Sequence, residues 1–385
     1  MPRTNPIPYN NSINYPLFNS SSYCFENTAQ IIKHHEDKTS MGRYARYDNP
    51  NWIEVERKLA ELDGCEEALL FPSGMSAIST TLLSLLKPND TFVFTGKGYR
   101  NIQAFCNTTL KKFDVNVIPL TQDEMTNASN YIEISKPYSP KVIFIEMPSN
   151  PHLYLTDIEY ISNNKSKNTI LIVDSTFASP INFTPKKFGA DLIIHSCSKY
   201  IGGHLDLMAG SVAGDMSMIQ EIRNMRNETG AIADSHTAFL LGRSIHTLDM
   251  RMKYLNKSGL ALASYLEKHN KVKKVFYPSK SNLSESELHL VDKYLKGYGG
   301  VVAFEINGDK STTSSFVDNL KIPFMATNFG SQYSLVEQCS VFTYYHNTPE
   351  ENMRLGITNT LVRYSCGFEP VNEIIDDIEQ ALNKI

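Results

Sequence analysis

Short apolar runs recur between helix-like segments from about residue 51 to residue 250, and this alternation constrains the fold more than any other feature. The runs are Thr91–Phe94, Val115–Leu120, Val142–Ile145, Ile170–Val173, Leu192–Ile194 and Ser211–Ala213. Most are β-branched or continuously apolar, as strands are when helices cover both faces of a parallel sheet. The alternation therefore predicts an α/β fold with a mostly parallel sheet.

Two helices are expected before the first of these runs. Val55, Leu59 and Leu62 lie at helical spacing in a segment that Gly64 ends. The second helix is expected to begin just after Gly74, because a turn of small residues precedes a stretch with apolar residues at helical spacing.

The ends of the chain differ in texture from this region. Residues 1–50 are rich in Pro, Asn and Ser, so we expect a loop-like arm that has no core of its own and lies on another surface. After residue 250 the strand-like runs Val301–Ile306 and Thr360–Ser365 follow one helix and precede another, without strict alternation. The sequence thus predicts an arm (1–50), an α/β domain (51–250) and a smaller C-terminal α+β domain (251–385).

Composition excludes several classes of protein. The 37 basic and 41 acidic residues give a net charge of -4, so nothing points to nucleic acid as a partner. No apolar run approaches the roughly 18 residues that span a bilayer, and no secretory signal is found, so no membrane association is expected. The six cysteines are scattered, which argues against a disulfide framework or a metal site and favours a reduced, cytoplasmic protein.

Lys199 is the first candidate for chemistry. It lies in Ser-Cys-Ser-Lys-Tyr-Ile-Gly-Gly-His, which directly follows the run Leu192–Ile194. Burial at the end of a strand lowers the pKa of a lysine and makes its amine nucleophilic toward an aldehyde. Ser196 and Ser198 are placed to donate hydrogen bonds to a phosphate. On local sequence alone, Lys199 also fits a surface lysine in a glycine turn.

Asp174 is the second candidate, at the end of the run Ile170–Val173. Ligands of open α/β sheets bind beyond the carboxyl ends of the strands. A carboxylate at that place suits the protonated nitrogen of a pyridine ring. The same residue type at a strand end is also a common helix N-cap.

Two further elements complete the pattern. Ser73-Gly74-Met75 opens a helix, and the free N–H groups and positive dipole there suit a phosphate. Tyr99 follows the run Thr91–Phe94 and is placed to stack on a flat ring. Alone, these are an ordinary helix start and an ordinary tyrosine. In the order phosphate turn, aromatic ring, carboxylate and lysine, they favour pyridoxal 5'-phosphate (PLP), held by Lys199 as a Schiff base.

These motifs resemble those of the Cys/Met-metabolism family of PLP enzymes, from about residue 16 to the C-terminus. The family includes cystathionine γ-synthase, cystathionine lyases, methionine γ-lyase and O-acetylhomoserine sulfhydrylase. The matching segments are Y-x-R…NP (44–50), S-G-M (73–75), E-x-P-x-N-P (146–151), D-x-T-F (174–177) and S-x-S-K-Y (196–200). The resemblance implies a large domain of the aspartate-aminotransferase type (fold type I) and a homo-oligomer, a tetramer of dimers that share active sites.

The resemblance also implies roles for individual residues. The cofactor-binding set is Tyr44, Arg46, Ser73, Gly74, Met75, Tyr99, Asn150, Asp174, Thr176, Ser196, Ser198 and Lys199, in which Tyr44 and Arg46 serve a neighbouring subunit. Arg363 is expected to clamp the α-carboxylate of an amino-acid substrate, a task that suits a bidentate guanidinium, and Ser334 lies in the substrate-side loop. Lys199 and Tyr99 are the expected catalytic residues, one at Cα and one at the leaving group.

The departures from the family lie on the substrate side. Arg100 and Asn101 replace small residues after Tyr99, Tyr333 stands where several members have Glu, and the segment 328–331 replaces S-L-G-G. Ala104 stands where relatives often have an arginine that can pair with a second substrate carboxylate. Without that arginine, such a substrate loses roughly 1.5–3 kcal/mol of binding free energy. Unless Arg100 or Arg43 takes the part of that arginine, an uncharged leaving group or an unusual substrate is favoured.

The sequence therefore predicts γ-replacement or γ-elimination on a sulfur-containing or O-acylated homoserine-type amino acid. The alternatives are β-elimination of the cystathionine β-lyase kind and a specialised role in secondary metabolism. A catalytically silent relative that serves as a binding protein is a more distant alternative.

Overall fold

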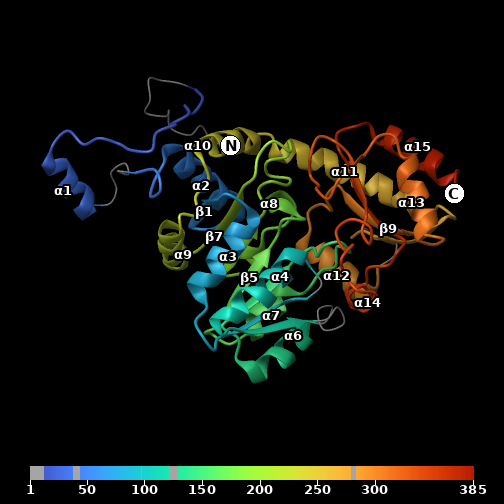
Figure 1. Ribbon diagram of the computed structural model, residues 1–385, viewed down its shortest axis with the longest axis horizontal. Coiled ribbons are helices and arrows are strands. Elements are labelled where there is room, and N and C mark those ends of the chain that lie inside the picture. Colours follow the sequence, from blue (N-terminus) through green and yellow to red (C-terminus); the bar gives the residue numbers. More distant parts are fainter. Residues whose placement is uncertain (1–12, 38–43, 97, 121–127, 279–282) are drawn as a thin grey trace.

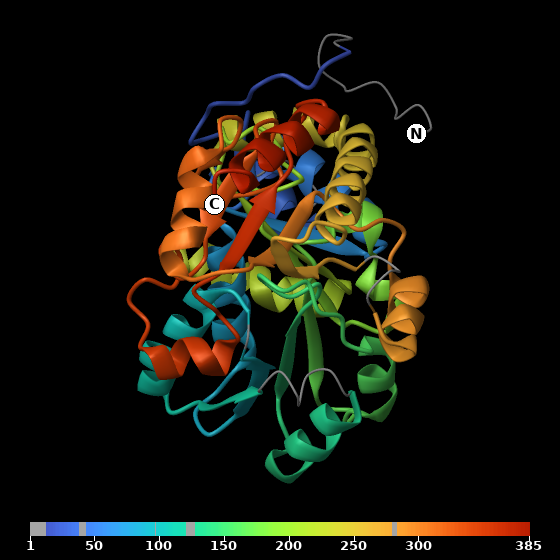
Figure 2. The ribbon, with the colours of Figure 1, turned by 90° about the vertical axis from the view of Figure 1, so that its right-hand side faces the viewer.

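The computed structural model describes residues 13–37, 44–96, 98–120, 128–278 and 283–385. Two sheets lie side by side, and an N-terminal segment that carries helix α1 (Thr28–Asp37) extends away from them, far from the C-terminal helix α15 (Val371–Leu382) (Figure 1). Figure 2 shows the second sheet and its helices packed against one end of the first. Across the described ranges, no helix is both long and apolar enough to cross a bilayer.

The first sheet has seven strands in the order β1-β7-β6-β5-β4-β2-β3. Their bounds are β1 Glu67–Phe71, β2 Thr91–Thr95, β3 Asn116–Leu120, β4 Val142–Glu146, β5 Ile170–Asp174, β6 Leu192–His195 and β7 Gly210–Gly214. Strand β7 is antiparallel to both of its neighbours, and the other pairs are parallel. The predicted α/β fold with a mostly parallel sheet is confirmed.

Helices cover both faces of this sheet, which is why its central strands are apolar throughout. They are α2 Pro50–Asp63, α3 Gly74–Leu85, α4 Arg100–Thr108, α6 Ala128–Ser135, α7 Ile158–Asn164, α8 Ser179–Asn182, α9 Met216–Thr229 and α10 Ser235–Ile245. Along β4 and β5, Phe144 and Ile172 enter the core on one face, whereas Ile143 and Leu171 enter the core on the other. This alternation is the two-residue period of a strand buried on both sides.

The second sheet has five strands in the order β10-β11-β12-β9-β8, with only β10 and β11 parallel. Its strands are β8 Val272–Phe276, β9 Val301–Ile306, β10 Phe324–Met325, β11 Leu335–Gln338 and β12 Leu361–Ser365. The helices of this region are α11 Leu248–Leu266, α12 Glu285–Tyr294, α13 Lys310–Asn319, α14 Pro349–Leu355 and α15. The mixture of helices and antiparallel strands agrees with the α+β pattern expected after residue 250.

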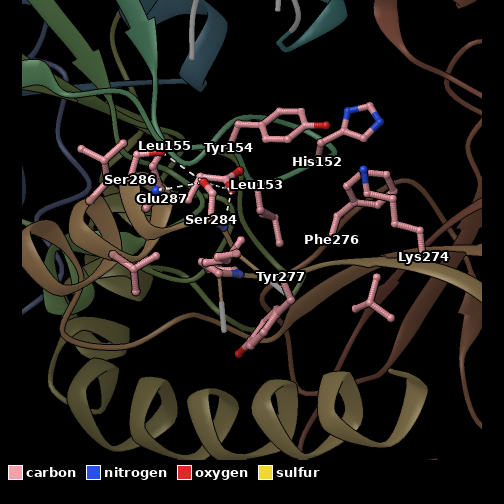
Figure 3. A pocket seen from close by; sticks show the side chains of 15 residues that line it. His152, Leu153, Tyr154, Leu155, Lys274, Phe276, Tyr277, Ser284, Ser286 and Glu287 are labelled. Atoms are coloured by element: carbon pink, nitrogen blue, oxygen red, sulfur yellow. Dashed lines mark hydrogen bonds between the residues drawn. The ribbon is translucent and has the colours of Figure 1, made fainter. Parts of the chain in front are cut away.

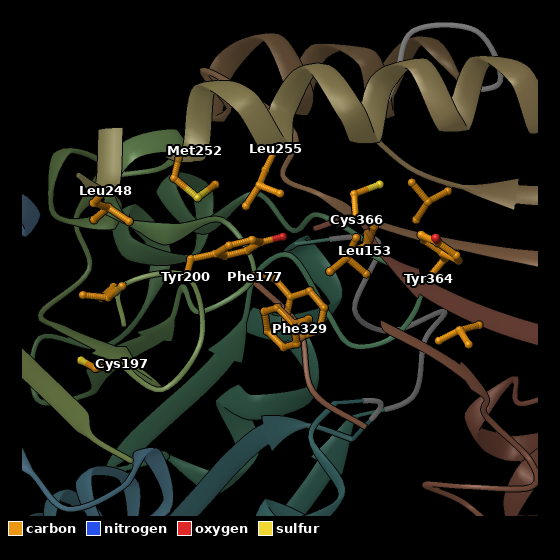
Figure 4. Packing of buried hydrophobic residues seen from close by; sticks show 14 of the residues in the cluster. Leu153, Phe177, Cys197, Tyr200, Leu248, Met252, Leu255, Phe329, Tyr364 and Cys366 are labelled. Carbon is orange, nitrogen blue, oxygen red and sulfur yellow. The ribbon is translucent and has the colours of Figure 1, made fainter. Parts of the chain in front are cut away.

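One apolar core joins the two sheets. Tyr200, which follows β6, packs against Met252 and Leu255 of α11, while Phe177 and Phe329 lie on its other side, with ring centroids 4.2 Å apart and ring planes tilted by 31° (Figure 4). Residues near the ends of the first sheet are thereby fixed relative to the second.

Several elements of the structure were not predicted from the sequence, among them β8, β10 and β11 of the second sheet. Strand β1 was not among the predicted runs; it is short and begins with the charged Glu67, and pairing with β7 fixes it. Residues 1–50 were expected to be loop-like, yet α1 lies among them, with nearly all of its side chains exposed. The boundaries of the three regions at residues 50 and 250 stay a prediction.

Arg226 provides a test of the packing between α9 and the first sheet. Its Nη1 atom lies 2.5 Å from Glu56 Oε1 and also donates to Leu70 O, and Arg226 is 1% exposed. We predict that Arg226→Met lowers the free energy of unfolding by about 3 kcal/mol or more, because Glu56 keeps a buried charge without its main partner.

The matched control is Arg57→Ala, which removes an arginine whose partners on α2, Glu54 and Glu61, lie at the surface. That loss should cost less than about 1 kcal/mol. Urea unfolding of both variants measures the difference, and equal midpoints would contradict the assignment of Arg226.

Candidate active site

Three parallel strands end together and bring the candidate residues to one edge of the first sheet. Glu146, the last residue of β4, pairs in register with Asp174, the last residue of β5. Asp174 in turn pairs with Ile194 of β6, so the segment Ser196–Lys199 leaves the sheet beside it. This edge is where open α/β sheets bind ligands.

The backbone around Lys199 is held from several sides. Arg251 of α11 donates to the carbonyls of Tyr200 and Ile201, and it is itself buried. Gly203 has φ +72°, and a Cβ atom there would lie 2.0 Å from Arg251 Nη1, so this turn requires glycine. The peptide that carries Lys199 therefore has little freedom.

The amine of Lys199 points toward the second sheet. Its Nζ atom donates to Asn328 Oδ1 and lies 5.3 Å from the ring centroid of Phe329. Burial and, to a smaller extent, the nearby charge of Arg363 together lower the pKa of Lys199 to about 8, while the charge of Glu337 opposes this shift. In the described part of the chain, no carboxylate forms an ion pair with this amine. About half of the amine is thus in its neutral, nucleophilic form at pH 8, a far larger fraction than in a free lysine.

Asp174 is buried, and one of its two carboxylate oxygens accepts hydrogen bonds from the protein. Thr176 donates to its Oδ1 atom through both its backbone N–H (2.9 Å) and its hydroxyl (2.6 Å), and the Thr176 hydroxyl accepts from Ser196 N at 2.8 Å. Burial raises the pKa of Asp174, and the Thr176 bonds and His195 oppose that rise. Among the described residues, Oδ2 has no hydrogen-bond donor, so this oxygen is available to a cationic partner.

Glu146 connects the aromatic candidate to the amide candidate. Its Oε2 atom accepts from Tyr99 N and its Oε1 atom from Asn150 N, each at 2.7 Å. Burial and the neighbouring Asp174 raise the pKa of Glu146. Tyr99 itself is 41% exposed, and its hydroxyl accepts from Asn101 Nδ2 at 2.9 Å. Burial of the ring raises the pKa of Tyr99, so the phenol keeps its proton at neutral pH.

Helix α3 begins at Gly74, close to the predicted start, and Ser73 is its N-cap, with a hydroxyl that accepts from Ser76 N at 3.0 Å. A Cβ atom on Gly74 would lie 2.9 Å from the Cβ of Ser196, so glycine permits the close approach of the α3 N-terminus to the segment that carries Lys199. Met75 packs into the core beside this turn. The Ser198 hydroxyl already has protein partners: it donates to Ala209 O and accepts from Ala209 N.

Arg363 lies on β12 of the second sheet and faces the same edge. Its Nη2 atom lies 2.6 Å from Glu337 Oε1 and donates to Thr327 O, and its Nη1 atom donates to Asn150 Oδ1 at 2.9 Å. Arg363 and Asn150 are separated by 213 positions in sequence, so this contact closes the first sheet's edge with the second sheet.

Three predicted residues lie apart from this cluster. Ser334 is fully buried, and its hydroxyl donates to Glu369 and accepts from Gly367 N. Tyr44 and Arg46 lie beside the C-terminal end of α9, where Arg46 donates to Asn227 O and its guanidinium lies over the Tyr44 ring. The structure therefore does not bring Tyr44 or Arg46 to Lys199 of the same chain.

Three functional candidates were missed as site residues in the sequence. Asn328 contacts Lys199, Glu337 pairs with Arg363, and Glu146 supports Tyr99 and Asn150. The position of Glu146 at the end of β4, equivalent to that of Asp174 at the end of β5, was a usable signal. Asn328 and Glu337 lie more than 120 positions from Lys199, and only the fold brings them near it.

A separate cavity of about 440 Å³ lies away from this cluster (Figure 3). Side chains that follow β4, such as His152 and Tyr154, face Phe276 of β8 and Glu287 of α12 across it. None of the predicted site residues lines this cavity.

The donor set at the sheet edge fits PLP. A neutral lysine amine suits the aldehyde, and the free oxygen of buried Asp174 suits the pyridine nitrogen. The N-terminus of α3, which Gly74 lets approach Ser196, suits the phosphate. The three features therefore match the three polar parts of the cofactor.

Comparison with known proteins gives sequence matches over nearly the whole chain. Residues 3–383 match the family described as Cys/Met metabolism PLP-dependent enzyme. Cystathionine gamma-synthase 1, chloroplastic, of Arabidopsis thaliana is 37% identical over 97% of this chain and 66% of its own length. L-methionine gamma-lyase of Fusobacterium nucleatum is 32% identical over 96% of this chain and 93% of its own.

A solved structure agrees with this result. The cystathionine gamma synthase of Xanthomonas oryzae pv. oryzae, crystallised in complex with cystathionine, superimposes with a TM-score of 0.91 at 29% identity, over 98% of this chain and 95% of that one. The chain belongs to the Cys/Met-metabolism PLP-dependent enzymes. The predicted family, fold type I, PLP as the cofactor and an enzymatic role are confirmed.

We predict that the amine of Lys199 in the cofactor-free protein titrates near pH 8, far below a free lysine, because burial and Arg363 disfavour its charged form. Its neutral fraction, and hence its reactivity, should rise as the pH passes through about 8. Competitive acetylation at a series of pH values, read by mass spectrometry of the Lys199 peptide, measures this pKa. A midpoint above pH 10 would contradict the burial of the amine.

Proposed function

We propose that the protein catalyses γ-replacement or γ-elimination on a sulfur-containing or O-acylated homoserine-type amino acid. The observation that carries the proposal is the buried Lys199 amine, whose pKa is lowered to about 8 by burial and by the nearby charge of Arg363. Relatives named cystathionine gamma-synthase, methionine gamma-lyase and cystathionine gamma-lyase support the same class of chemistry.

PLP, when bound, supplies an electron-accepting ring joined to the substrate amine. We propose that Asp174 holds the ring nitrogen, that Ser73, Gly74 and Ser196 hold the phosphate, and that Asn150 lies at the phenolic side of the ring. Three further residues support these contacts. Thr176 orients Asp174, Ser198 fixes the loop at Ala209, and Met75 packs against the core beside the phosphate turn.

Arg363 binds the α-carboxylate of the substrate. Its Nη2 atom is held by Glu337 and its Nη1 atom by Asn150, so the plane of the guanidinium is set before a substrate arrives. Such preorganisation lowers the entropic cost of binding and orients the Cα–H bond of the substrate toward Lys199.

Lys199 then moves the proton. Its neutral amine takes the proton from Cα of the bound amino acid and later gives a proton back to the substrate. A pKa of about 8 suits both transfers at neutral pH. The Tyr99 phenol, still protonated because burial raises its pKa, is placed to give a proton to the departing γ-substituent.

The arm at residues 1–50 completes the proposal. Tyr44 and Arg46 lie beside α9 and do not contact Lys199 of their own chain, an arrangement that suits a shared active site in a homo-oligomer, a tetramer of dimers. A reducing, cytoplasmic setting fits the six cysteines, all of which are free. Ser334, with its hydroxyl on Glu369, would act by shaping the substrate-side loop.

A panel of amino acids with γ- and β-leaving groups, each with and without cysteine, tests the function. We expect thiol-dependent products or 2-oxoacid from the γ-substituted compounds, detected by mass spectrometry and oxoacid assay. We also expect Lys199→Ala to lose at least about a thousandfold in kcat, because it lacks the base.

The γ-reaction would be excluded if only β-substituted amino acids reacted. A role as a silent binding protein would follow if no amino acid were turned over and none changed the absorbance of the bound cofactor.

A further inference from the structure

We propose that Arg100 is a positioning residue, which holds the substrate-binding Arg363 in place through Thr343 and Glu337. The inference rests on the proposed function of Arg363. It assigns a role to a residue at which the chain departs from its family.

A chain of hydrogen bonds leads from Arg100 to Arg363. The Nη1 atom of Arg100, at the start of α4, donates to Thr343 O at 2.9 Å. The hydroxyl of Thr343 donates to Glu337 Oε2 at 2.5 Å, and the other oxygen of Glu337 lies 2.6 Å from Arg363 Nη2. Arg100 thereby ties the edge of the first sheet to the turn that follows β11 of the second.

A second series of hydrogen bonds leads from Arg363 back to Arg100. Arg363 donates to Asn150 Oδ1, Asn150 N donates to Glu146, and Glu146 accepts from the backbone N–H of Tyr99, the residue before Arg100. The result is a closed ring that includes both the substrate arginine and the loop of the proposed acid, Tyr99. A closed ring restrains each member more than an open chain does, since no part can rotate without breaking a bond elsewhere.

Two members of the ring are suitable for substitution. Glu146, Glu337, Arg363 and Asn150 are buried, so the loss of any of them leaves an unpaired polar group in the core. Arg100 and Thr343 are only half-buried. In the described part of the chain, Arg100 also has no carboxylate partner, so its removal opens the ring without stranding a charge.

A direct role for Arg100 on the substrate side chain is the competing explanation. The two explanations predict different affinities for alanine, an amino acid without a γ-substituent. If Arg100 acts through Arg363, alanine binding depends on it; if Arg100 touches only the γ-substituent, alanine binding does not.

The test is the affinity of the PLP-loaded protein for L-alanine, read from the change in cofactor absorbance. We expect Arg100→Ala and Thr343→Val each to weaken binding by about 3- to 30-fold. The double variant should be no weaker than the worse single variant, because both break one ring. Arg100→Lys should retain part of the affinity, and Arg57→Ala on α2 should retain all of it.

A second measurement does not need the cofactor. The turn that Arg100 holds contains the bonds Val341 N–Gln338 O and Tyr344 N–Cys339 O. Hydrogen exchange at Val341 and Tyr344 should be faster in cofactor-free Arg100→Ala than in the wild type, and unchanged in Arg57→Ala.

Unchanged alanine affinity in Arg100→Ala, or single effects that multiply in the double variant, would overturn the inference. If the wild type showed no response to alanine, the proposed function itself would have failed. Unchanged exchange at Val341 and Tyr344 would in that case still refute the ring.

Discussion

The parallel pairing of β4, β5 and β6 is the constraint on which the site depends. Because these strands run side by side in one direction, their carboxyl ends deliver Glu146, Asp174 and the Lys199 segment to a single edge. The apolar core around Tyr200 then fixes the second sheet opposite that edge, which brings Arg363 within reach. Chemistry that needs a base, a ring-nitrogen partner and a carboxylate clamp thus follows from strand order and one shared core.

The charges at this edge are arranged so that Lys199 stays reactive. A carboxylate beside the amine would hold it as an ammonium ion, yet its nearest polar partner is the neutral amide of Asn328. The Arg363 charge disfavours a second cation, and Glu337, which faces Arg363, limits this effect. The carboxylates Asp174 and Glu146 are buried at the same sheet edge, where Asp174 can stabilise a cationic ring nitrogen.

Much of this arrangement could be predicted from the sequence, because local signals and motifs carry it. The apolar runs that became β2 to β7 lie within a residue or two of the observed strands, and Ser73 and Gly64 begin and end helices as expected. Strand β1 escaped prediction because it begins with Glu67 and contains no β-branched residue, and α1 because it has no buried face.

The remaining contacts depend on distant parts of the chain. Asn328 meets Lys199 across 129 positions, and Arg100 meets Thr343 across 243. No periodicity or local motif encodes such pairs, so the sequence could mark Arg100 and the segment 328–331 as unusual but could not say what they touch. In the structure, Asn328 contacts the base Lys199, and Arg100 is linked to the substrate clamp Arg363 through Thr343 and Glu337.

The most direct test of the account is the site at which PLP becomes attached. The protein is loaded with PLP, reduced with borohydride, digested and analysed by mass spectrometry. The account predicts a single phosphopyridoxyl group, on the peptide that contains Lys199, and no label on that peptide when PLP is omitted. A label on another lysine, or none at all, would contradict it.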